Sequence, residues 1–227
     1  MTATRMKTNR GANRMQKGFS VVELMIVVAI SLIVAAFAIP GYRSIVRNLR
    51  INGDMRDVHG AIAEAKMRAA AGFTHGRFYA DLNANTFHLE VWNKAGNGGA
   101  GCWQTDGDTR NGDCTAASSP VVPLSQGVTF GFGTASAGGK NPQTTLAQAP
   151  LCGKVAAVSG VANGTTANTA CIEFNSRGIP IDLTGKPTAN DALYITDRNM
   201  VYGITLLSSG MQQDWATKAG TSSWTVR

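Results

Sequence analysis

Residues 18–40 form an apolar stretch of membrane length that contains one acid. Between Phe19 and Ile39 the only polar side chains are Ser20, Glu23 and Ser31. A helix over this stretch spans about 31 Å, which matches the hydrocarbon core of a bilayer. A carboxylate at the centre of such a helix costs roughly 2.5–3.5 kcal/mol, and less near an end. Glu23 therefore needs either a function or a partner.

Basic residues flank this stretch unequally. Five basic side chains and no acid precede it (Arg5, Lys7, Arg10, Arg14 and Lys17), and three arginines follow it (Arg43, Arg47 and Arg50). The positive-inside rule predicts a cytoplasmic N-terminus and a C-terminal part on the far side of the membrane. The stretch is too long for the apolar region of an ordinary secretory signal, and no A-x-A cleavage site follows it.

Apolar residues continue at helical spacing beyond Pro40. Proline removes one backbone hydrogen bond and favours a kink there. One apolar face then recurs at intervals of three and four residues, through Ile51, Met55, Val58, Ile62, Ala65 and Ala69. Gly72 is a plausible C-terminal stop. The pattern predicts one helix from about Phe19 to Ala71, with an amphipathic second half over 41–72.

The rest of the chain, residues 73–227, reads as strands and long loops. A hairpin is predicted from two alternating segments, 77–82 and 86–93, joined by Asn83-Ala84-Asn85. Further strands are predicted at 121–124, 128–132, 154–159, 170–175, 192–196 and 200–207. Residues 94–120 and 133–150 read as loops, and 208–227 as a polar tail apart from Trp215 and Trp224. A helix followed by antiparallel strands predicts an α+β fold, with the helix packed on one sheet face.

Four cysteines, Cys102, Cys114, Cys152 and Cys171, follow the apolar stretch. An oxidising compartment permits disulfides, and three pairings are possible from sequence alone. Cys102–Cys114 and Cys152–Cys171 are favoured because each closes a short loop; free buried thiols are the alternative. Zinc is not expected, because no C-x₂-C or paired-histidine spacing occurs.

The N-terminus resembles that of type IV prepilins and type II secretion pseudopilins. The matching features are a basic leader ending in Lys17-Gly18, then Phe19-Ser20, Glu23 and an apolar stretch with Pro40. The resemblance implies cleavage after Gly18 by a prepilin peptidase, N-methylation of Phe19, and extraction from the membrane into a filament. It also implies that Glu23 pairs with the new Phe19 amine of a neighbouring subunit. A plain signal anchor with an incidental acid is the alternative.

Three shorter segments resemble the GspH/FimT group of minor pilins and pseudopilins. Ala61–Arg68 is similar to that group's A-R-x-E-A-x-x-R helix segment, and Cys171–Gly178 to its F-x-x-x-G turn. Tyr202–Leu206 lies where the last strand of the group is expected. The resemblance implies a minor subunit, present in few copies near a filament tip.

DNA binding is the main alternative function. Some FimT-like pilins bind DNA through an arginine-rich C-terminal G-R-x-R motif, which this tail lacks; it has only Arg198, Lys218 and Arg227. The net charge of +7 includes the five basic residues of the leader, so the chain after Gly18 carries 16 basic and 14 acidic residues. This balance is poor support for nucleic-acid binding, although Trp215 and Trp224 could stack on bases.

Other motifs have simpler explanations. Gly96–Gly101 satisfies G-x-G-x-x-G but opens no helix, so a flexible loop is favoured over a dinucleotide site. Asp106, Asp108 and Asp113, with Asn111, could bind calcium, but their spacing is not that of an EF-hand. The three histidines, His59, His75 and His88, accompany no hydrolase motif.

The chain is thus expected to be a structural subunit without catalytic residues, cofactor or metal. Its expected parts are a leader (1–18), a membrane and assembly helix (19–40), an amphipathic helix (41–72) and a β-rich periplasmic domain (73–227). The expected partners are other pilin or pseudopilin subunits, prepilin peptidase and the lipid of the inner membrane; nucleic acid is not expected. The expected location is the inner membrane, followed by a pilus or pseudopilus.

Overall fold

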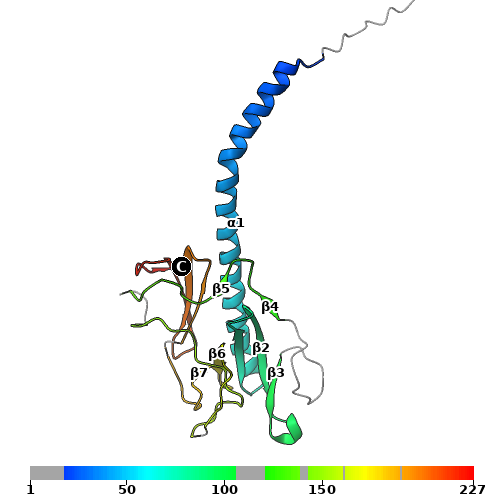
Figure 1. Cartoon of the computed structure of the whole chain (residues 1–227). Coiled ribbons are helices and arrows are strands. Elements are labelled where there is room, and N and C mark those ends of the chain that lie inside the picture. The colour runs from blue at the N-terminus through cyan, green and yellow to red at the C-terminus, as the bar shows by residue number, and fades with distance from the viewer. Residues whose placement is uncertain (1–17, 106–120, 139–142, 161, 190) are drawn as a thin grey trace, which may run out of the picture. The chain divides into compact units, whose positions relative to one another are not determined.

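A computed structural model describes residues 18–105, 121–138, 143–160, 162–189 and 191–227 (Figure 1). The chain divides into two compact units, one that ends at Ile45 and one from Val46 to Arg227. The only α-helix within the described ranges, α1 (Val21–Ala71), is 51 residues long. Its bounds confirm the expected continuous helix, and its backbone stays helical through Pro40.

The C-terminal end of α1 is fixed by backbone hydrogen bonds. Thr74 N donates to Ala69 O at 3.1 Å, and Phe73 N donates to Ala70 O at 3.3 Å. This is the pattern of a Schellman motif, in which the residue after the helix takes a left-handed conformation. Phe73 occupies that position with φ 47°, directly after the expected stop at Gly72.

The strands form two antiparallel sheets rather than the single sheet that the sequence predicts. The first sheet has the order β3-β2-β1-β6-β7, with β4 paired to β2. Its strands are β1 (Gly76–Asp81), β2 (Thr86–Asn93), β3 (Cys102–Thr105), β4 (Val122–Pro123), β6 (Thr169–Phe174) and β7 (Pro180–Ile181). The second sheet has the order β11-β10-β9-β8-β5. Its strands are β5 (Thr129–Phe130), β8 (Ala192–Thr196), β9 (Met200–Leu206), β10 (Gln212–Lys218) and β11 (Thr225–Val226).

The core lies between the second half of α1 and both sheets. The helix contributes the six residues that the sequence pattern places on one face, Ile51, Met55, Val58, Ile62, Ala65 and Ala69. Alternate residues of β1 and β6 meet them, such as Phe78 and Ile172, together with Leu193 of β8 and Ile204 of β9. The fold is therefore α+β, with an amphipathic helix segment packed on antiparallel sheets. A smaller cluster forms around Tyr194 and Trp224.

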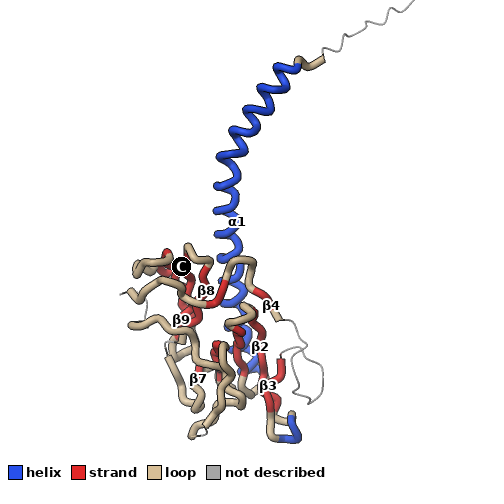
Figure 2. The backbone as a smooth tube through the Cα atoms, in the orientation of Figure 1, coloured by secondary structure: helices blue, strands red, loops and turns tan. Residues whose placement is uncertain are grey.

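One expected strand is absent, and several observed strands lie where loops were expected. Residues 154–159 form no strand, because their backbone bonds locally: Val155 N donates to the side chain of Asn163, and Lys154 N donates to Gly164 O. The described parts of the segment between β5 and β6 form no regular strand (Figure 2). By contrast, β3 lies inside the expected loop 94–120, and β10 and β11 lie in the expected polar tail.

The two tryptophans of the C-terminal region are core residues. Trp215 and Trp224 are only 7% and 2% exposed. Their indole N–H groups donate to Thr205 Oγ1 and to Ser136 O, respectively. Neither ring is presented to solvent, so these tryptophans do not offer a surface on which bases could stack.

Candidate assembly site

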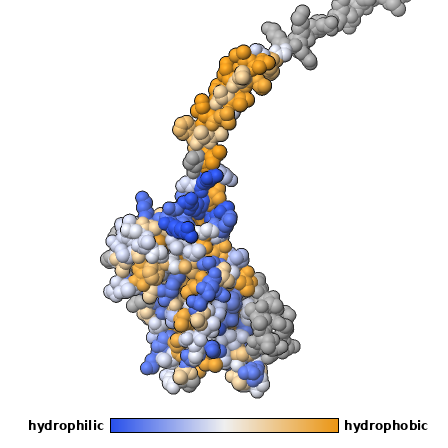
Figure 3. Space-filling model, viewed as in Figure 1, coloured by the Kyte–Doolittle hydropathy of each residue, from blue (hydrophilic) through white to orange (hydrophobic). Residues whose placement is uncertain are grey.

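The apolar half of α1 presents its side chains outward within the described structure. Phe19 is 81% exposed, and the large apolar residues from Val21 to Ile39 are all more than half exposed, apart from Val28 at 50%. Figure 3 shows hydrophobic side chains gathered along this part of the helix. An 18-residue window in α1 has a mean hydropathy of 2.8, so the helix is long and apolar enough to cross a membrane.

One side of this segment is a continuous apolar strip. Val21, Leu24, Met25, Val28, Ala29 and Leu32 line a shallow depression on the helix. Their spacing alternates between three and one residues, which places them along a single helical face. A strip with this spacing is suited to packing against another helix.

The two serines of the apolar stretch are satisfied within the helix itself. Ser20 Oγ accepts a hydrogen bond from Val22 N at 3.3 Å, as an N-cap residue does. Ser31 Oγ donates to Val27 O at 2.8 Å. Neither serine therefore requires a polar partner outside the chain.

Glu23 differs from the serines. It lies in the first turn of α1, where the helix dipole favours a negative charge. Among the described residues, no hydrogen bond or ion pair reaches its carboxylate. An acid in an apolar environment is costly unless a positive charge or a donor compensates it. Any partner of Glu23 therefore lies outside the described part of the chain.

The residues on either side of the expected cleavage point are accessible. Gly18 and Phe19 precede α1 and are exposed. A Cβ on Gly18 would meet no atom within 4 Å. Packing against the described residues therefore sets no requirement for glycine at this position. Cleavage after Gly18 and methylation of Phe19 stay predictions, as does a role for Pro40 in assembly.

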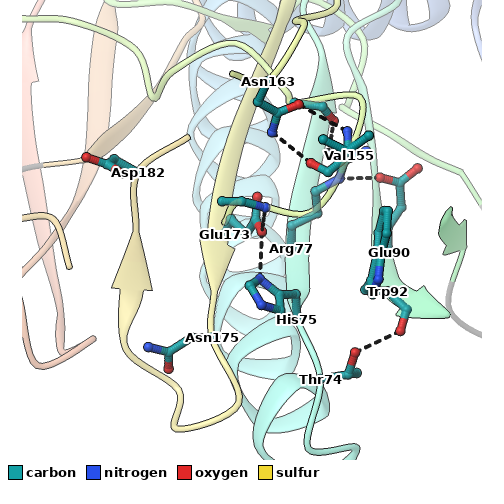
Figure 4. A network of polar contacts seen from close by, with 12 residues as sticks. Thr74, His75, Arg77, Glu90, Trp92, Val155, Asn163, Glu173, Asn175 and Asp182 are labelled. Atoms are coloured by element: carbon teal, nitrogen blue, oxygen red, sulfur yellow. Dashed lines mark hydrogen bonds and ion pairs between the residues drawn. The ribbon is translucent and has the colours of Figure 1, made fainter. Parts of the chain in front are cut away.

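Several acids of the domain have internal partners, and Figure 4 shows the main network. Arg77 of β1 lies between Glu90 of β2 and Glu173 of β6 in the strand register. Its guanidinium forms an ion pair with Glu90 and donates to Gly153 O. It also stacks over the ring of Trp103, with the guanidinium carbon 4.0 Å from the ring centroid. This buried charge is thus paired on several sides.

Each of the three histidines lies beside a carboxylate. His75 Nδ1 is 2.9 Å from Glu173 Oε1, which also accepts a hydrogen bond from Ala157 N. His59 Nδ1, on α1, is 2.8 Å from Asp214 Oδ1 on β10, and His88 Nε2 is 3.3 Å from Glu90 Oε1. His75, just before β1, is therefore joined to β6. The contacts of His59 and His75 join parts of the chain that are distant in sequence, so these two histidines help to hold the domain together.

Burial and pairing shift several pKa values in the domain. Burial lowers the pKa of Arg77, although the charge of Glu90 opposes this effect. Burial also raises the pKa of Glu90, but the hydrogen bond from His88 and the charge of Arg77 outweigh it, so the net shift is downward. Asp191 has no such compensation: burial, with a contribution from the charge of Asp182, raises its pKa to about 6.

A disulfide joins the segment before β6 to β6 itself. Cys152 and Cys171 are bonded, with their Cα atoms 4.9 Å apart, which is the pairing favoured from the sequence. Cys102 is also in a disulfide. Its expected partner Cys114 lies outside the described residues, as do Asp106, Asp108, Asn111 and Asp113, the ligands considered for calcium. The described residues contain no cluster suited to a metal ion.

A groove of about 470 Å³ runs between α1 and the edge of the first sheet. Its helix wall includes Arg56, Gly60 and Glu64, and β2 contributes Phe87 and His88. The described lining contains no serine, cysteine or lysine, the side chains that most often act as nucleophiles. The Gly96–Gly101 motif forms a turn with a short 3₁₀ segment, η1 (Asn97–Gly99), and opens no α-helix.

Comparison with known proteins identifies the N-terminal segment. The family model of the prokaryotic N-terminal methylation motif matches residues 13–39, the end of the leader and most of the apolar stretch. A search of curated proteins finds no match to the chain. A search of solved structures likewise finds none. The methylation motif, the apolar helix that begins within it and the α+β fold together support a type IV pilin-like protein.

Proposed function

We propose that this protein is a minor pilin or pseudopilin, a structural subunit that is processed after Gly18 and assembled through its N-terminal helix. The observation that carries the proposal is Glu23. Within the matched methylation motif it is an acid on an outward-facing apolar helix, and the described structure offers it no partner. The mature amine of Phe19 on a neighbouring subunit supplies the charge that it lacks.

The proposed mechanism is mechanical rather than catalytic. The apolar strip that includes Leu24, Val28 and Leu32 packs against helices of neighbouring subunits and provides most of the cohesion. The Glu23–amine pair selects the register, because an unpaired charge in an apolar bundle is strongly disfavoured. The domain is held on the outer side of the membrane, in line with the charge difference across the apolar stretch.

We further propose that the protein belongs to the GspH/FimT group of minor pilins and pseudopilins. Two features of the domain agree with it. Asn175–Gly178 forms a tight turn, in which Gly178 N donates to Asn175 O at 2.8 Å and Gly178 has φ 71°. Tyr202–Leu206 lies in β9, at the centre of the second sheet. No observation favours DNA binding, since both C-terminal tryptophans are buried and Arg227 stacks on Tyr202.

The experiment compares Glu23→Ala with Ser31→Ala. Both variants remove a polar group from the same apolar helix, but the Ser31 hydroxyl already bonds to the Val27 carbonyl of its own turn. We expect Glu23→Ala to reduce incorporation into filaments at least tenfold, and Ser31→Ala to incorporate like the wild type. Incorporation is measured by immunoblotting sheared filaments, with the membrane content as reference. Equal incorporation of wild type and Glu23→Ala would refute the proposal.

A further inference from the structure

The helix segment that follows the apolar stretch is unusually basic. Residues 41–53 contain three arginines, Arg43, Arg47 and Arg50, and no acid. All three arginines are exposed on α1. Their spacings of four and three residues place them on neighbouring positions of the helix surface. The positive-inside rule gives no reason for such a group on the outer side of the membrane.

Arg50 has a partner in the domain, whereas the other two do not. Arg50 Nη1 donates to Gln126 O at 3.4 Å, in the segment between β4 and β5. Arg43 and Arg47 make no hydrogen bond or ion pair with any described residue. The nearest acid along the helix, Asp54, accepts hydrogen bonds from Ser125 N and Ser125 Oγ. The charges of Arg43 and Arg47 are therefore unmatched within the described chain.

Along the helix, Arg43 lies at the depth of the lipid headgroup layer, and Arg47 lies about one turn beyond it. Arg43 and Arg47 follow Ile39 by about 6 Å and 12 Å of helix rise. The headgroup layer on each side of the hydrocarbon core is roughly 5–8 Å thick. Helical side chains lean toward the N-terminus, so these long side chains extend back toward the apolar segment.

A neighbouring tyrosine supports a lipid environment. Tyr42 is 69% exposed and directly precedes Arg43. Tyrosine is enriched where a transmembrane helix meets the headgroup layer, because its ring is apolar and its hydroxyl is polar. Exposed Ile45 and Leu49 alternate with the arginines along the same helix. Together they give this segment the mixed character of a membrane-interface helix.

We propose that Arg43 and Arg47 bind the phosphate groups of anionic phospholipids, in the leaflet on the far side of the membrane from the leader. The proposal rests on the membrane insertion of the proposed function. Two guanidinium groups on adjacent turns bind phosphate oxygens by charge-assisted hydrogen bonds. The contact holds the subunit at a fixed depth before assembly, and it must break when the helix is extracted into a filament.

Lipid retention by the chain from Phe19 onward tests this proposal, since the five basic residues of the leader would themselves favour anionic lipid. The protein is purified in mild detergent and mixed with equal amounts of phosphatidylglycerol and phosphatidylcholine, and the lipids that co-purify are counted by mass spectrometry. An anionic surface favours each basic residue by about fivefold. We therefore expect phosphatidylglycerol to be enriched roughly tenfold or more, and Arg43→Gln/Arg47→Gln to bring the two lipids close to parity.

Two further variants and one competitor make the result specific. Arg56→Gln/Arg177→Gln removes two other exposed arginines and should keep the enrichment, and Arg43→Lys/Arg47→Lys should keep most of it. Parity in the wild type, or an equal loss in the Arg56→Gln/Arg177→Gln control, would overturn the proposal. Displacement of the lipid by an equal concentration of inorganic phosphate would also overturn it, since it would show a general phosphate site.

A second measurement distinguishes failure of the lipid proposal from failure of the proposed function. It is the mass of the N-terminal peptide of the subunit, taken from cells that make the filament. A chain that is cleaved and assembled but shows no lipid preference contradicts only the lipid proposal. A chain that prefers phosphatidylglycerol but retains its leader contradicts only the assembly proposal.

Discussion

Within the described residues, charged side chains have partners in much of the domain but not in the apolar half of α1. In the domain, Arg77 and Glu90 form a buried ion pair. Glu173 contacts His75 and accepts a hydrogen bond from Ala157 N. In the apolar half, Glu23 meets no partner within the described residues. The first arrangement is complete within the described chain, whereas under the proposed function the second is completed by a neighbouring subunit. The difference separates charges that stabilise the fold from the one that we propose serves assembly.

The two halves of α1 show the same contrast in their apolar residues. Ile62 is fully buried against the sheets, whereas Ile30 is 56% exposed. Both are isoleucines on one continuous helix. Helix propensity and composition alone do not distinguish them; the difference lies in whether the chain provides a surface to pack against. The apolar half remains available for lipid or for other subunits.

The largest effect is expected from breaking the buried ion pair of the domain. Arg77→Met leaves Glu90 buried without its main positive partner, which costs about 3–5 kcal/mol of the free energy of unfolding. Chemical denaturation of the full-length chain in detergent measures the loss. Arg77→Met/Glu90→Leu should recover much of it, because no charge is then left unpaired. A single variant as stable as the wild type would remove the distinction between the two regions.

A matched pair of isoleucine substitutions tests the contrast along the helix. Ile62→Ala creates a cavity in the core and should lower the free energy of unfolding by about 2–5 kcal/mol. Ile30→Ala deletes the same atoms at an exposed position and should leave the unfolding of the domain unchanged. Thermal unfolding followed by circular dichroism compares the two variants. Similar losses in both would show that the apolar half contributes to the stability of the domain.

The smallest effect is expected at Asp191, where the domain leaves an acid poorly compensated. Burial and the charge of Asp182 raise its pKa to about 6, from an ordinary value of 3.8. Between about pH 4 and pH 6 the folded chain retains a proton that the unfolded chain releases, so stability falls as the pH rises through this window. Asp191→Asn should flatten that fall and add about 1–2 kcal/mol at pH 7.5.

Denaturation curves at several pH values measure the Asp191 effect. Asp57→Asn, at an exposed acid of α1, is the control and should keep most of the pH dependence, because the charge of Asp57 makes only the smallest contribution to the raised pKa of Asp54. A wild-type stability that rises between pH 4 and pH 6, with Asp191→Asn parallel to it, would contradict the assignment.

The sequence predicted the helix well because its signals are local. Only Glu23 and Ser31 interrupt the apolar run from Val21 to Ile39, the face from Ile51 to Ala69 has regular helical spacing, and Gly72 follows the last turn. The β1–β2 hairpin was predicted for a similar reason, since its two strands alternate and Asn83–Asn85 form a clear turn. The same local motif predicted Glu23 as the functional acid of the apolar segment.

The remaining strands were harder because their burial depends on distant parts of the chain. Strand β10 is polar in sequence, and Trp215, Ala216 and Thr217 are buried only because β9 and β11 lie beside it. Residues 154–159 contain an apolar run but bond to Asn163 and Glu173 instead of to a strand. The Arg77 network was also missed, since its members come from β1, β2 and β6. The alternation of Arg77 and Tyr79 with buried Phe78 was the one local signal for it.

The most direct test of the central claim is the mass of the mature N-terminus in assembled filaments. The account predicts a chain that begins at Phe19 and carries one N-methyl group, with the leader absent. Filaments are sheared from cells, and the subunit is identified by mass spectrometry of its N-terminal peptide. An assembled subunit that still carries residues 1–18, or that begins at any residue other than Phe19, would contradict the account.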